Sequence, residues 1–166
     1  PGQGWRIAMT TLLFERGASD SQNRDRAEDL RLLDRVIALA HRTRRDGRPA
    51  IEDPMIRDRI AGLWIVAEAL RAGGQRSAVP GLCSDFPMAL PMMHKLVFSE
   101  LAQKITRLAC DALGSDAVLW MGDPQAPDGA EWPRALMNSY GFTIGGGTSE
   151  IQRNIIATRG LGMPRA

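Results

Sequence analysis

The chain has 166 residues, of which 44% are hydrophobic and 24% are charged. This composition is typical of one folded domain and not of a disordered chain. The 21 basic and 19 acidic residues leave a formal charge of +2. Both signs are mixed along the sequence, which argues against nucleic-acid binding. No apolar run approaches the ~20 residues of a membrane-spanning helix, so no membrane insertion is expected. Two cysteines and two histidines are scattered, which predicts no metal site and a reducing, cytoplasmic setting.

The start of the chain lacks an initiator methionine and a signal peptide,. A helical pattern follows almost at once, so we interpret residues 1–166 as one domain of a longer polypeptide. Residues 5–14 are apolar on most sides, which predicts a buried first helix.

Helical periodicity continues through the first half of the chain. Apolar residues recur at helical spacing over about 25–45, and the Gly-Arg-Pro at 47–49 should end that helix,. The Asp-Pro at 53–54 is a helix start signal, because a capping carboxylate precedes a proline that needs no N–H partner. This third helix should end at the two glycines at 73–74,.

The second half follows the same pattern. A long helix should span about 91–113, with Gly114 just beyond its last turn,. Residues 122–129 hold two prolines and should form a surface loop,. The last helix should begin near Ser149, where Ser149 and Gln152 fit a capping box. No segment alternates between apolar and polar residues, so we expect no sheet. The pattern predicts an all-α fold, an antiparallel up-and-down four-helix bundle over residues 1–166.

Two places could carry chemistry. The first is Glu15 followed by Arg16, at the end of a strongly apolar helix. One interpretation is an ion pair at the rim of the bundle. The other is a carboxylate in an apolar cleft, where burial would raise its pKa and make it a competent base near neutral pH.

The second place is the glycine run at 145–147, which leads into the last helix. Such a run exposes backbone N–H groups, lets a ligand approach closely and favours negative charge. The alternative is a flexible loop with an ordinary helix cap. The segment is not a P-loop, because no Gly-Lys-Ser/Thr follows, and no predicted strand precedes it.

Residues 146–157 read GGTSEIQRNIIA, and RGLGMPR follows at 159–165. This tail resembles the C-terminal signature of the acyl-CoA dehydrogenase family. Residues 4–12 and the Phe-Glu-Arg-Gly at 14–17 resemble the first helix of its C-terminal domain, so the resemblance spans the whole chain. Within the family, the sequence is similar in type to actinobacterial members that degrade lipids and sterol side chains. The resemblance implies the last of three domains, without the N-terminal helical domain and the central β-domain.

The resemblance also implies a reaction and a set of site residues. Enzymes of this family bind FAD and convert an acyl-CoA to the trans-2-enoyl-CoA. A glutamate removes the α-proton and flavin N5 accepts the β-hydride. Many members carry this glutamate at the position of Gly146, whereas a minority carry it before an arginine in the first helix. Glu15 therefore matches the catalytic base, Arg16 would orient it, and Gly146 and Gly147 would bind substrate, with the Gly146 N–H directed at the thioester carbonyl.

The same resemblance assigns the cofactor contacts. Thr148, Ser149 and Glu150 match a stretch that contacts FAD, although glutamine is common at the position of Glu150. The segment 43–47, Thr-Arg-Arg-Asp-Gly, departs from the Arg-x-x-Phe-Gly with which many members reach the FAD of a neighbouring subunit. The implied partners are an acyl-CoA substrate, an electron-transfer flavoprotein as acceptor, and other subunits in a homo- or hetero-oligomer, a dimer or tetramer.

Two other functions stay open. The departure at 43–47 favours a catalytically silent subunit that completes a heteromeric dehydrogenase, whereas Glu15 argues against it. A flavin oxidase or monooxygenase on the same scaffold would use oxygen as the acceptor instead.

Overall fold

A computed structural model describes residues 2–15, 28–77, 79, 81–82 and 89–164. The described part is mostly helical, and its elements are, in chain order, α1 (Gly4–Glu15), α2 (Glu28–Arg42), β1 (Arg44–Arg45), β2 (Arg48–Pro49), the 3₁₀ helix η1 (Ala50–Glu52), α3 (Pro54–Ser77), α4 (Ala89–Leu113), the 3₁₀ helices η2 (Gly114–Val118) and η3 (Pro127–Ala130), α5 (Glu131–Ile144), α6 (Ser149–Ile155) and the π-helical turn η4 (Ile156–Gly160).

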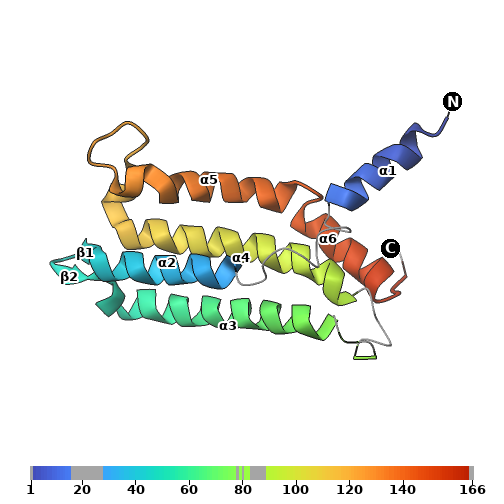
Figure 1. The fold of residues 1–166 in the computed structure, drawn as a ribbon, viewed down its shortest axis with the longest axis horizontal. Coiled ribbons are helices and arrows are strands. Elements are labelled where there is room, and N and C mark those ends of the chain that lie inside the picture. Colours follow the sequence, from blue (N-terminus) through green and yellow to red (C-terminus); the bar gives the residue numbers. More distant parts are fainter. Residues whose placement is uncertain (1, 16–27, 78, 80, 83–88, 165–166) are drawn as a thin grey trace.

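Helices α2, α3, α4 and α5 lie side by side, and successive helices run in opposite directions (Figure 1). This confirms the predicted all-α, up-and-down bundle. The core lies around α4, which contacts the other three helices of the bundle. The buried apolar side chains of the core include Leu33, Val36 and Leu39 from α2, Ile56, Ile60 and Ala67 from α3, Leu101, Ile105, Leu108, Ala109 and Ala112 from α4, and Trp132 from α5.

Helix α1 differs from the expected buried helix. Trp5 is 78% exposed and Ile7 is 64% exposed, and Figure 1 shows α1 extending away from the bundle. The reason lies in the apolar pattern itself. Apolar residues occur on most sides of α1, so no single stripe matches a groove, and α2 to α5 already surround the core.

The predicted absence of a sheet was wrong at one small ladder. Helix α2 ends at Arg42, and β1 and β2 then pair antiparallel, with Arg45 opposite Arg48. Between them Asp46 has φ +51° and Gly47 has φ +79°, which is the left-handed pair that a two-residue type I′ hairpin requires. The Asp-Gly dipeptide is a strong local signal for such a turn, and it interrupts the helix before the proline does.

The predicted ends of α3 and α4 were confirmed in part. The N–H of Met55 donates to Asp53 Oδ1 at 2.8 Å, which confirms the predicted cap of α3. Gly114 has φ +62° directly after α4, as expected. The prediction that Gly73 and Gly74 end α3 was wrong. Each glycine costs only about 1 kcal/mol inside a helix, and Gly74 is buried within α3.

We expect Asp53→Ala to lower the free energy of unfolding by about 1 kcal/mol, because α3 loses its N-cap acceptor. Asp53 also lies 3.5 Å from Arg45 in an ion pair. Asp53→Asn is therefore the matched control, since it keeps a capping oxygen and removes the charge. Urea denaturation followed by circular dichroism measures both variants. Equal losses for Ala and Asn would assign the effect to the ion pair instead of the cap.

Candidate functional site

The turn 145–148 links α5 to α6 and contains the glycines predicted to bind substrate. Gly146 has φ +67° and Gly147 has φ +108°, a region that residues with a side chain rarely adopt. A Cβ at Gly147 would lie 3.1 Å from Gln152 Nε2 and 3.2 Å from Ile151 Cγ2. The backbone conformation therefore favours glycine at position 147, and the space for a Cβ there is tight.

The cap of α6 lies one residue earlier than predicted. Thr148 is the N-cap residue, and its Oγ1 accepts a hydrogen bond from the N–H of Ile151 at 3.4 Å. The predicted capping box of Ser149 with Gln152 was wrong. The side chain of Gln152 is 3% exposed and donates from Nε2 to the carbonyl oxygen of Gly146 at 2.6 Å. The left-handed turn brings this carbonyl over the first turn of α6, and Gln152 is the buried donor that satisfies it.

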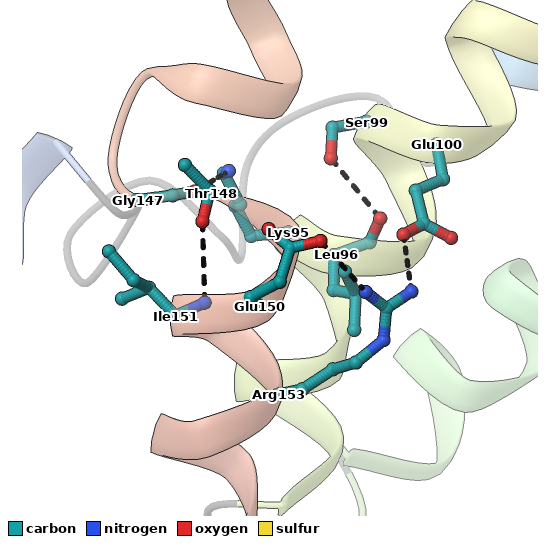
Figure 2. Close-up of polar contacts among 9 residues, drawn as sticks. All are labelled: Lys95, Leu96, Ser99, Glu100, Gly147, Thr148, Glu150, Ile151 and Arg153. Carbon is teal, nitrogen blue, oxygen red and sulfur yellow. Dashed lines mark hydrogen bonds and ion pairs between the residues drawn. The ribbon is translucent and has the colours of Figure 1, made fainter.

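Helix α4 contributes two polar contacts to this region (Figure 2). Lys95 is half-buried, and its Nζ donates to the carbonyl oxygen of Gly147 at 2.7 Å. Five residues along α4, Glu100 Oε1 accepts from a guanidinium nitrogen of Arg153 on α6 at 2.6 Å. Sequence reasoning gave Lys95 no role in the site. The available signal was a charged residue among the otherwise uncharged first residues of this helix.

Glu150 lies at the exposed start of α6. Its own backbone N–H and the hydroxyl of Thr148 hold the pKa of this carboxyl below its usual range, and Arg153 adds to the effect. The Arg153 guanidinium lies 3.9 Å from the carboxylate. Glu150 is therefore ionised at neutral pH, and it presents a negative charge beside the hydroxyl that caps the helix.

Most of the predicted site residues lie in the turn 145–148 and at the start of α6. Gly146, Gly147 and Thr148 are in the turn, and Ser149 and Glu150 begin α6. Glu15 is the last residue of α1, and its side chain, like the whole of Arg16, lies outside the described residues. In the view of Figure 1, the C-terminal end of α1 is directed towards the α5–α6 turn.

We also searched the described part of the chain for a metal site, a membrane-spanning helix and a cavity. Its histidine, cysteine and acidic residues form no group that could hold a metal ion. None of its helices is long and apolar enough to cross a membrane. A hollow of about 440 Å³ lies near the hairpin end of the bundle, between α3 and α4. Its charged lining residues form two ion pairs, Arg45 with Asp53 and Arg59 with Asp111.

A model of the family described as "Acyl-CoA dehydrogenase, C-terminal domain" matches residues 2–161. The chain belongs to this family. It is 36% identical to acyl-CoA dehydrogenase IpdE1 of Mycobacterium tuberculosis over 99% of this chain and 40% of that protein. It is 30% identical to acyl-CoA dehydrogenase FadE29 of the same organism over 98% of this chain and 40% of that protein. The chain thus spans about two fifths of these relatives.

Solved structures of acyl-CoA dehydrogenases share the fold. The ChsE4-ChsE5 complex from Mycobacterium tuberculosis has a TM-score of 0.72 and 29% identity, over 98% of this chain and 41% of that one. A variant of the Tcur3481-Tcur3483 steroid ACAD has a TM-score of 0.72 and 25% identity, over 98% of this chain and 41% of that one. These findings confirm the resemblance drawn from the terminal motifs and the all-α bundle.

We expect Gly147→Ala to destabilise the protein by about 1–3 kcal/mol, because the backbone at φ +108° becomes strained,. The matched control is Gly141→Ala, since Gly141 lies exposed in α5 and a Cβ there meets nothing within 4 Å. That control should be neutral or stabilising by up to about 1 kcal/mol. Chemical denaturation measures both. An equal change in the free energy of unfolding for the two variants would contradict the left-handed backbone at Gly147.

Proposed function

We propose that the chain forms the C-terminal helical domain of an FAD-dependent acyl-CoA dehydrogenase that converts an acyl-CoA thioester to the trans-2-enoyl-CoA. The observation that carries the proposal is the family match over residues 2–161, together with the turn 145–148 and the start of α6 that follows it. The 36% identity to IpdE1 supports it. The reaction is proposed for the complete protein that contains this domain, with an electron-transfer flavoprotein as the acceptor.

The residues of the turn fit one edge of FAD. The N–H of Thr148 and the hydroxyl of Ser149 have no acceptor among the described residues, and Ser149 is half-buried. FAD offers hydroxyl, carbonyl and phosphate oxygens that accept such hydrogen bonds. Thr148, Ser149 and Glu150 would hold the cofactor at this edge. When bound, FAD supplies the acceptor for the hydride that leaves the β-carbon of the substrate.

The thioester would lie beside the glycines. Gly146 and Gly147 carry no side chain, so an acyl-CoA can approach the backbone closely. Gly146 is buried at φ +67°, and it offers no carboxylate at the position where many family members carry their base. A base from another element is therefore required.

Glu15 is the proposed base. It would remove the α-proton of the substrate, and Arg16 would balance its charge and orient it. The direction of the C-terminal end of α1 in Figure 1 supports this assignment.

In the complete protein, Glu15→Gln should leave FAD bound and slow flavin reduction by acyl-CoA by about 10²–10⁴-fold, because the amide keeps the shape and loses the basicity. The measurement is anaerobic bleaching of flavin absorbance after mixing. The control is Glu52→Gln, an exposed position in η1, which should bleach at the parent rate. Bleaching of Glu15→Gln at the parent rate would overturn the assignment of the base.

A second candidate is a catalytically silent domain in a heteromeric acyl-CoA dehydrogenase. The similar ChsE4-ChsE5 structure from Mycobacterium tuberculosis is a complex of two differently named proteins. The hairpin favours an altered subunit contact in this chain, since Asp46 stands at φ +51° where many members carry phenylalanine. Native mass spectrometry of the purified protein tests this candidate. A second, different chain together with a Glu15→Gln variant of unchanged rate would favour the silent domain.

A further inference from the structure

The α5–α6 turn requires a left-handed backbone at two glycines, which are conformationally flexible residues,. Two successive glycines have more conformations to lose on folding than any other pair of residues. Among the described residues, three hydrogen bonds hold them. Gly147 N–H donates to the carbonyl of Ile144 at 3.1 Å. Gln152 Nε2 holds the carbonyl of Gly146 at 2.6 Å, and Lys95 Nζ holds the carbonyl of Gly147 at 2.7 Å.

These three bonds differ in what they connect. Ile144 belongs to α5 and Gln152 to α6, so their bonds join the turn only to its own flanking helices. Lys95 is 52 residues away in sequence and belongs to α4, whose later turns form the centre of the core. Its ammonium makes a charge-assisted hydrogen bond, which is stronger than a neutral one. Of the three, only this bond ties the turn to the core helix.

The bond also determines where the next amide points. A trans peptide is planar, so its C=O and N–H are directed to opposite sides. The Gly147 carbonyl is directed at Lys95 on α4 (Figure 2). The N–H of Thr148 is therefore directed away from Lys95, and no described residue accepts it. Because residue 147 is a glycine, this peptide could otherwise rotate at small cost.

We propose that Lys95 is a positioning residue of the site, whose ammonium fixes the Gly147–Thr148 peptide and so sets the orientation of the Thr148 amide. Its consequence for catalysis rests on the proposed function, because Thr148 would hold the flavin. Lys95 touches neither the cofactor nor the reacting atoms in this proposal. It acts through the backbone of the turn.

A merely structural link between α4 and α6 is the rival explanation, and the chain offers a control for it. The Glu100–Arg153 pair also joins these two helices. Arg153 reaches Glu150 at 3.9 Å, but the pair makes no polar contact with residues 145–148 in Figure 2. Glu100→Gln weakens this link and leaves Lys95 in place. An effect seen in Lys95→Met and absent in Glu100→Gln is therefore not explained by the α4–α6 link alone.

The first experiment is hydrogen exchange of the purified protein, followed in peptides that cover residues 145–152. Lys95→Met keeps the aliphatic stem and removes the donor. We expect exchange in this segment to rise by roughly 10- to 100-fold, as the loss of a charged hydrogen bond implies. Lys95→Arg should retain most of the protection, and Glu100→Gln should stay close to the parent. If Lys95→Met fails to fold, Lys95→Gln, whose amide is too short to replace the ammonium, takes its place.

Two results would overturn the role of Lys95. One is unchanged exchange in Lys95→Met, and the other is an equal rise in Glu100→Gln. The second experiment measures flavin reduction by acyl-CoA, which should be slowed by roughly 10- to 100-fold in Lys95→Met with FAD still bound, and restored in large part by Lys95→Arg. If exchange rises while the parent protein itself reduces no flavin, the proposed function fails and the role of Lys95 in the turn stands. If exchange rises and the active parent and Lys95→Met react equally fast, the positioning role in catalysis is wrong.

Discussion

The burial of α4 is the constraint on which the rest of the structure depends. Leu101, Ile105 and Leu108 are at most 1% exposed, and α2, α3, α5 and α6 all contact this helix. Alanines alternate with these large residues on α4, which lets neighbouring helices approach closely. Each Å² of apolar surface that is buried contributes about 25 cal/mol to stability. Because four helices cover α4, this contribution stabilises its position from several sides. The same helix carries Lys95 and Glu100 nearer its start, and the position of the site therefore follows from the packing of the core.

Much of the bundle could be predicted because its signals are local. One-sided apolar periodicity identified α2, α3 and α4, and the Asp53 cap and Gly114 followed from residue chemistry. The predicted helix ends were wrong where one structural preference opposed another. A type I′ turn at Asp46 ended α2 early, and α3 continued through Gly74 because tertiary burial outweighed a small helix penalty,. The exposure of α1 could not be predicted from its composition. Apolar residues on most sides of a helix do not indicate which of its faces packs against the rest of the chain.

The site was predictable in position but not in its contacts. The glycine run before Thr148 identified the turn, since only a few residue types suit left-handed backbone and helix caps. The partners of the turn were not predictable, because the Lys95–Gly147 bond joins residues 52 positions apart and periodicity carries no information on such polar pairs. The assignment of Glu15 as the base comes from the family resemblance and stays a prediction, as does the role of Arg16.

The two halves of the proposed site are held by different kinds of force. The turn at Gly147 is fixed by directional hydrogen bonds from three helices, so its geometry is defined within the described bundle. Helix α1, which ends at Glu15, leaves Trp5 78% and Ile7 64% exposed. Covering that apolar surface is favourable and has no preferred direction of its own. The placement of the proposed base would therefore depend on what covers α1, whereas the placement of the proposed cofactor edge would depend on α4. The proposed reaction would require both to be correct within about 1 Å.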